Sequence, residues 1–294
     1  MRILVTGASG MLGSTLAVIL SKNHDVFGTG NSKTSLPIKY LKFNLLNNSY
    51  KKVIDWARPE LIIHCAAITD GNYCESNPEE AFSVNGISVS KFLKHSDQSV
   101  KFIYISTDAV FPSSLNYANE NDSISPENIY GKSKELGEFF IKRALNRSYT
   151  IIRTTIVGVN EFSNKTSFVE WILNSVNANK KIGLFSDVLF SPISIWNLSF
   201  QINYLIDSKN INSETLHISG EACSKYKFGL ELLKAFNIDS SKVKKSSILN
   251  FKKRAKRSQD QSLNSNLYKR KYKMDLPNLS TTISEIKKYY HEEN

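Results

Sequence analysis

The chain has 294 residues, of which 41% are hydrophobic, enough for one large domain or two smaller ones around an ordinary buried core. Its three cysteines, Cys65, Cys74 and Cys223, are an odd number at irregular spacing, which predicts neither a disulfide framework nor a zinc site. Glycines interrupt the apolar N-terminus too early for a signal-peptide core, and no later apolar run approaches the roughly 20 residues that span a bilayer. We therefore expect a cytoplasmic protein with no membrane partner and no metal site.

The net charge of +11 is unevenly distributed along the chain. Residues 242–273 contain twelve lysines and arginines and a single acid, Asp260. Such a tract can bind nucleic acid, but aromatic residues are sparse in it and no nucleic-acid motif accompanies it. The pattern favours a solvated basic face that partly meets a phosphorylated ligand.

The first half of the chain alternates short apolar runs with helical segments, as parallel strands joined by crossover helices do. Strands are predicted at residues 2–6, 24–28, 40–43, 61–65, 100–106 and 149–155. Helices are predicted at 12–21, 51–57, 78–95 (with Asn77 as N-cap) and 130–147. The fold class is therefore α/β, a doubly wound parallel sheet of the Rossmann type.

The pattern loosens after residue 155. Helices are predicted at 167–177, 195–206 and 227–236, and a strand at 215–219. We expect a dinucleotide-binding core at residues 1–155 and a smaller substrate-recognition region at 156–294, partly interleaved with that core because no linker separates them.

Gly7, Gly10 and Gly13 follow the first predicted strand at three-residue intervals, and Met11 and Leu12 open the first helix. Glycines at this junction let the backbone approach a pyrophosphate, and the helix N-terminus offers free N–H groups. A structural turn without a ligand is the alternative, but the location between strand and helix favours dinucleotide binding.

The residues at the end of the second strand indicate which of the two nicotinamide cofactors the protein binds. An acid that would hold a ribose 2′-hydroxyl is absent there, and Asn31 and Lys33 suit a 2′-phosphate instead. This favours NADP(H) over NAD(H), although Lys33 can equally be read as a solvated loop residue. Ala66 and Ala67, after the fourth strand, are small enough for a cofactor to lie against the sheet edge.

Tyr130 and Lys134 are four residues apart on one helical face, and Thr107 ends a strand. A phenol with an ordinary pKa of about 10 exchanges protons poorly near neutrality, and a nearby ammonium would lower that pKa. Thr107 can orient the same substrate oxygen. A chance helical pair is the alternative. His64 and Cys65 lie on a buried strand, where packing is a better interpretation than catalysis.

Three segments together resemble the dTDP-4-dehydrorhamnose reductase family of extended short-chain dehydrogenases. They are 6–13 (TGASGMLG), 106–111 (STDAVF) and 130–138 (YGKSKELGE), with 153–155, 190–192 and 255–263 in the family's order. The resemblance implies NADPH-dependent reduction at C4 of a nucleotide-linked 4-keto-6-deoxysugar, in deoxysugar and cell-surface polysaccharide biosynthesis.

The resemblance also implies residue roles. Tyr130 is the proton donor, Thr107 orients the carbonyl, and Lys134 holds the nicotinamide ribose. Asp108 belongs with Thr107 to the substrate site, and Arg257 would bind the nucleotide diphosphate. A homodimer is compatible with the sequence, which leaves the oligomeric state open.

The chain departs from the family's pattern at four positions. Ala109 and Ile156 replace aromatic residues near the sugar, which leaves the identity of the sugar open. Asn44 replaces an aspartate and Ser258 a proline. Alternative functions are a nucleotide-sugar epimerase or dehydratase of the same superfamily, and a non-catalytic subunit like the regulatory subunit of methionine adenosyltransferase.

Overall fold

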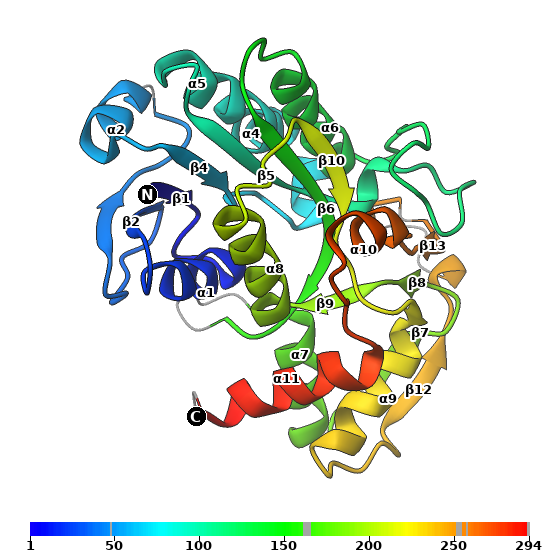
Figure 1. The fold of residues 1–294 in the computed structure, drawn as a ribbon. Coiled ribbons are helices and arrows are strands. Elements are labelled where there is room, and N and C mark those ends of the chain that lie inside the picture. Colours follow the sequence, from blue (N-terminus) through cyan, green and yellow to red (C-terminus); the bar gives the residue numbers. More distant parts are fainter. Residues whose placement is uncertain (48, 161–165, 251–254, 257, 293–294) are drawn as a thin grey trace.

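A parallel sheet forms the centre of the molecule in the computed structural model, which describes residues 1–47, 49–160, 166–250, 255–256 and 258–292 (Figure 1). The strand order is β3-β2-β1-β4-β5-β6-β10, and β9 pairs with β6. The strands are β1 (Arg2–Thr6), β2 (Asp25–Gly30), β3 (Lys39–Lys42), β4 (Leu61–His64), β5 (Lys101–Thr107), β6 (Tyr149–Val157), β9 (Pro192–Ser194) and β10 (Glu214–His217). This order confirms the predicted doubly wound α/β fold.

Successive side chains of each strand enter different cores on the two faces of the sheet. Ile3 and Val5 of β1 belong to one cluster, and Leu4 between them belongs to the other. The first face is covered by α1 (Met11–Leu20) and α8 (Ile195–Asp207). The same cluster continues into α7 (Phe168–Asn177) and α11 (Leu279–Glu292), which pack against α9 (Lys225–Ala235), with α11 also against β9. The second face is covered by α2 (Tyr50–Ala57), α5 (Ser88–His95) and α6 (Ile129–Lys142).

The remaining elements are short. In the first half they are α3 (Gly71–Ser76), α4 (Pro78–Phe82), the π-helix η1 (Ser83–Ile87) and the 3₁₀ turn η2 (Asp108–Val110). In the second half they are β7 (Ile182–Phe185), β8 (Leu189–Phe190), β11 (Cys223–Ser224), α9 (Lys225–Ala235), β12 (Val243–Ser246), η3 (Ile248–Asn250), β13 (Asp260–Gln261) and α10 (Asn266–Tyr272).

The predicted helix at 78–95 is interrupted. Residues 83–87 widen into the π-helix η1, and Asn77 stands at the N-cap of α4 without a side-chain capping bond. Its amide instead donates to the Tyr73 carbonyl, 3.0 Å away. The π turn lets the Asn85 side chain face the loop after β4, where it bonds both the N–H and the carbonyl of Ile68.

The predicted helix at 130–147 is too long, since α6 ends at Lys142. The Arg147 guanidinium is buried and donates to backbone carbonyls of Leu93, Ser96 and Val100. These hydrogen bonds give the buried carbonyls their partners and hold Arg147 in the turn that leads into β6, outside the helix. In the described part of the chain, every helix is too short or too polar to cross a bilayer.

Candidate active site

The glycine turn joins β1 to α1 at the carboxyl edge of the sheet. Gly7 has a φ of +70°, and a β-carbon there would lie 2.7 Å from the backbone N and Cα of Ala66. Gly10 is the N-cap of α1, with no side-chain capping bond and no acid in the first turn, which contains Met11 and Leu12. These features fit a pyrophosphate, because the turn admits a close backbone approach and the helix end carries free N–H groups.

The end of β2 lies beside this turn. A β-carbon on Gly30 would come within 2.4 Å of the Ser9 hydroxyl oxygen. Asn31 and Lys33 follow in an exposed loop, and the last residues of the strand, Phe27 to Gly30, include no acid. The surroundings fit a 2′-phosphate better than a bare ribose.

Thr107 lies at the end of β5, next to the first turn of α6. Its hydroxyl donates to Asp108 Oδ1, 2.8 Å away, and accepts the Ala109 N–H at 3.2 Å. The other Asp108 oxygen accepts the Thr155 hydroxyl at 2.8 Å. Burial raises the Asp108 pKa, and these two hydroxyls lower it. Both carboxylate oxygens are thus engaged by protein hydroxyls, so Asp108 orients Thr107.

Tyr130 is held in the first turn of α6. Asn128 caps the helix by accepting the Gly131 N–H at 2.8 Å, and a β-carbon on Gly131 would lie 2.2 Å from the Ala109 carbonyl oxygen. This close approach packs the helix start against η2 and brings the phenol near the Thr107 side chain, which acts on its pKa. Two residues 23 positions apart in the sequence therefore share one site.

The electrostatics of Tyr130 differ from the sequence-based expectation. Burial raises the pKa of its phenol, and the hydrogen bond with Thr107 offsets this only in part. Lys134 is 2% exposed, and burial lowers its pKa to about 7, against the opposing charge of Glu138. The Tyr130 pKa is therefore raised and not lowered as predicted, because burial is its largest influence and Lys134 is not among the groups that shift it.

Glu138 and Arg153 form a buried ion pair next to the site. Glu138, one turn after Lys134, accepts two hydrogen bonds from Arg153 of β6, at 2.9 and 2.7 Å, and one from Ser106 at 2.7 Å. Burial by itself would raise the Glu138 pKa, but Arg153 more than offsets it and the pKa lies below its ordinary value. The pair ties α6 to β5 and β6.

His64 and Cys65 are structural, as predicted. The His64 ring is bonded to the hydroxyls of Thr6 at 2.9 Å and Ser88 at 3.1 Å, and burial lowers its pKa to about 3. Burial raises the Cys65 pKa to about 12. Ala66 follows and donates its N–H to Thr6, so the network holds the loop of Ala66 and Ala67 beside the glycine turn.

Asn85 is a site-organising residue that the sequence analysis missed. Besides bonding Ile68, its amide donates to Ser133 of α6 at 2.8 Å, next to Lys134. No sequence motif marks it, because the contact depends on the π turn.

Arg257 lies outside the described residues. Its neighbour Lys256 contacts the start of the catalytic helix, since its carbonyl accepts the Asn128 amide at 2.7 Å and its ammonium pairs with Glu127 at 2.9 Å. This segment therefore borders the Tyr130 end of α6.

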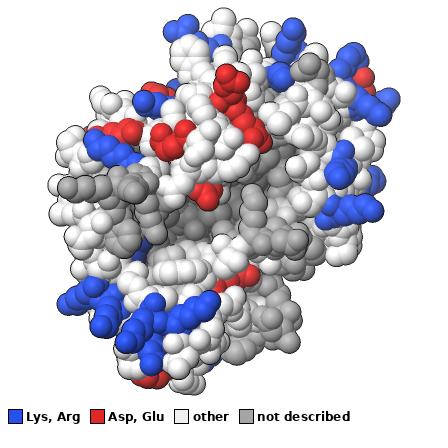
Figure 2. All heavy atoms as spheres, turned by 180° about the vertical axis from the view of Figure 1, so that it is seen from behind, with Lys and Arg blue, Asp and Glu red and all other residues white. Residues whose placement is uncertain are grey.

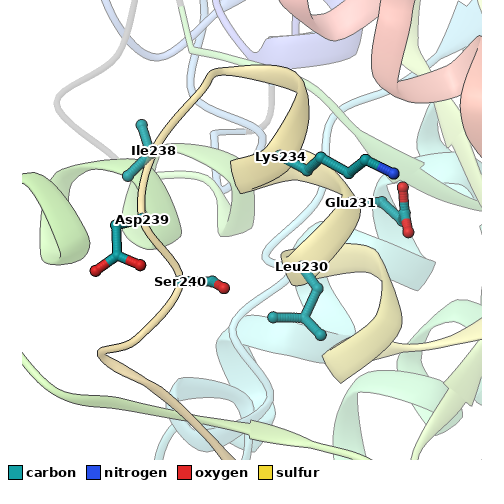
Figure 3. Close-up of a pocket in the computed structure, with 6 residues that line it drawn as sticks. All are labelled: Leu230, Glu231, Lys234, Ile238, Asp239 and Ser240. Atoms are coloured by element: carbon teal, nitrogen blue, oxygen red, sulfur yellow. The ribbon is translucent and has the colours of Figure 1, made fainter.

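Basic side chains gather on the lower part of the face in Figure 2. Within the basic tract, the exposed residues include Lys244, Lys245, Lys269, Arg270 and Lys271, as a solvated face requires. A pocket of about 460 Å³, whose lining includes neither Thr107 nor Tyr130, lies at the end of α9 and the loop after it (Figure 3). Its lining residues are Leu230, Glu231, Lys234, Ile238, Asp239 and Ser240.

Known proteins are similar in sequence to this chain over most of their length. A dTDP-4-dehydrorhamnose reductase of Aggregatibacter actinomycetemcomitans is 30% identical over 245 residues, covering 79% of this chain and 78% of that protein. Methionine adenosyltransferase 2 subunit beta of Pongo abelii is 28% identical over 251 residues, covering 83% of this chain and 74% of that protein.

A solved structure is similar over almost the whole chain. The dTDP-4-dehydrorhamnose reductase of Bacillus anthracis str. Ames, in complex with NADP, superimposes with a TM-score of 0.85 at 27% identity, covering 97% of this chain and 98% of that one. The family model described as the RmlD substrate binding domain matches residues 1–291. These findings confirm the resemblance drawn from the motifs, and the chain belongs to this reductase family.

Proposed function

We propose that the protein is an NADPH-dependent reductase of a nucleotide-linked 4-keto-6-deoxysugar. The observation that carries this proposal is that Tyr130 lies near Thr107 in the first turn of α6, with the buried Lys134 one turn later, at the carboxyl edge of a doubly wound sheet that also carries the glycine turn. The similarity to reductases, one of them in complex with NADP, supports the substrate and the cofactor.

Each residue has a separate task in the proposed reaction. When bound, NADPH supplies a hydride to the sugar C4. Tyr130 donates its proton to the C4 oxygen, and its raised pKa keeps that proton in place until the oxygen becomes negative. The Thr107 hydroxyl, which donates to Asp108 in this structure, would turn its proton to the C4 oxygen of the bound sugar and so orient the carbonyl. Lys134 would hold the nicotinamide ribose.

Cofactor and substrate would enter from opposite sides of this trio. The glycine turn, Asn31, Lys33, Ala66 and Ala67 would hold the cofactor on the side of residues 1–155. Residues 156–294 would supply most of the substrate side, where Arg257 would bind the diphosphate. A homodimer remains a prediction.

An assay of NADPH oxidation with dTDP-, UDP-, GDP- and CDP-linked 4-keto-6-deoxysugars tests reaction and substrate together. Stoichiometric NADPH consumption separates a reductase from an epimerase or dehydratase that recycles its cofactor. Tyr130→Phe should lower turnover by about 100- to 10,000-fold with little loss of NADPH binding. Near-normal turnover would exclude Tyr130 as the proton donor.

The relative named as a methionine adenosyltransferase subunit raises a second candidate, a regulatory protein that keeps the fold without turnover. A complete absence of NADPH oxidation across the panel, in protein that still binds NADPH, would favour that candidate.

A further inference from the structure

Lys225 is the first residue of α9 and follows directly after β11. Its backbone N–H donates to the Val188 carbonyl, 3.1 Å away, and β11 pairs with β8 so that Cys223 stands opposite Phe190. These contacts tie the start of α9 to β8, a strand of the predicted substrate-recognition region. The position of Lys225 is thus set by a sheet and not by a free loop.

The Lys225 side chain lies against an aromatic wall. Its Nζ is 5.7 Å from the ring centroid of Phe168 and 5.8 Å from that of Phe190, and both rings pack against Phe228. The side chain is half-buried. An ammonium held beside aromatic rings is partly desolvated, and an anion brought to it interacts more strongly than it would in open water.

Strand pairing places Lys225 near Asp108. Phe190, whose ring lies beside the ammonium, is two residues before Pro192, which pairs with Thr155 of β6. The Thr155 hydroxyl donates to Asp108. Consistent with this, the Lys225 charge is among the influences that lower the pKa of Asp108.

The small sheet places a second segment on the far side of β8. Its order is β11-β8-β13, and the Leu189 N–H of β8 donates to the Gln259 carbonyl, 2.7 Å away. The start of α9 and the chain just after Arg257 thus flank the same strand. Residues that the sequence separates by more than 30 positions converge on β8.

We propose that Lys225 binds the diphosphate of the nucleotide-sugar substrate. This inference rests on the proposed function. A 4-keto-sugar whose C4 oxygen lies at Thr107 and Tyr130 carries its diphosphate at C1, the opposite end of the ring. A half-buried cation beside an aromatic wall, on an element next to the Asp108 end of the site, suits that anion. The basic tract from residue 242 onward does not include Lys225, so the sequence pattern did not mark it.

The test measures binding of dTDP, dTMP and UDP to the purified full chain by calorimetry, with NADPH binding measured in parallel. In Lys225→Met, dTDP affinity should fall about 10- to 100-fold, the range expected for one charge-assisted contact. The gap in affinity between dTDP and dTMP should narrow. Lys225→Arg should keep most of the affinity, because a guanidinium also binds phosphate.

Lys227→Met is the matched control, because Lys227 is exposed on the same helical turn. It should leave dTDP binding nearly unchanged. Equal dTDP affinities in Lys225→Met and Lys227→Met would overturn the assignment of Lys225 and leave the reductase proposal standing.

Two further outcomes are also decisive. If Lys225→Met loses NADPH affinity by the same factor as dTDP affinity, the lysine supports the fold and does not bind the diphosphate. If the unaltered protein binds none of these nucleotides, the nucleotide-sugar substrate class itself fails, together with the inference about Lys225.

Discussion

Neutralising Glu138 should destabilise the protein strongly. Its carboxylate is 0% exposed and accepts two hydrogen bonds from Arg153, one from Ser106 and one from Lys142, the last at 3.2 Å. In Glu138→Gln the Arg153 guanidinium stays buried without a counter-charge. Breaking a buried pair by removing one partner costs about 3–5 kcal/mol, a large share of the stability of a typical domain.

Urea unfolding at pH 7, with the slope of the transition compared between variants, measures this loss. Asp55→Asn is the matched control, because Asp55 forms an exposed pair with Lys51 that contributes little. Adding Arg153→Met to Glu138→Gln should recover part of the stability, since no charge is then left buried. A loss in Glu138→Gln no larger than in Asp55→Asn would refute the reasoning.

The same pair predicts a pH dependence. The folded-state pKa of Glu138 lies below its ordinary value. Its stabilisation is therefore fully present above the unfolded pKa of about 4.3 and is lost as the pH falls through the folded pKa. The stability gap between the unaltered protein and Glu138→Gln should shrink in that acidic range and stay constant from pH 6 to 8.

Four further predictions concern single residues. Gly7→Ala should cost at least about 1–3 kcal/mol of stability and weaken NADPH binding, because φ is +70° and its β-carbon would meet backbone; unchanged NADPH affinity would contradict this. Lys33→Ala should narrow the ratio of NADPH to NADH dissociation constants, and equal constants in the unaltered protein would remove the basis for a 2′-phosphate site. Arg257→Ala should raise the KM for the nucleotide sugar about 10- to 100-fold, whereas Lys269→Ala should cause a small change that high salt abolishes; matching kinetics would count against Arg257. Burial lowers the Lys134 pKa to about 7, so between pH 7 and about 10 the unfolded chain binds more protons than the folded chain. The unaltered protein should therefore gain stability relative to Lys134→Met as the pH rises through this window. A stability difference that stays constant over this range would show that Lys134 titrates normally.

Local patterns were sufficient to predict the core of the fold and part of the candidate site. The continuous apolar runs of β1, β4 and β5 are visible in the sequence because a strand with both faces covered must be apolar throughout. Gly7 could be recognised because a strand-to-helix turn needs a positive φ. Tyr130 and Lys134 could be paired because one helical turn separates them.

Elements of the second half were harder to predict. β8, β11 and β13 have two residues each, too few to show a period, and they exist because they pair with one another. The π turn at Asn85 follows from contacts with Ile68 and Ser133, which lie 17 and 48 positions away. No local pattern can report such contacts.

Charge states depended on the tertiary structure most of all. From the sequence, Lys134 was a cation that would lower the pKa of Tyr130, yet burial raises that pKa and brings the Lys134 pKa down to about 7. Glu138 and Arg153 both lie in segments that resemble the family, but the sequence did not indicate that they form an ion pair. Nothing in the sequence distinguished Lys225 from the other lysines. The sequence determined which ionisable groups are present and which elements carry them. Their pKa values and partners were decided by tertiary packing, because desolvation and charge pairing depend on neighbours that are distant along the chain.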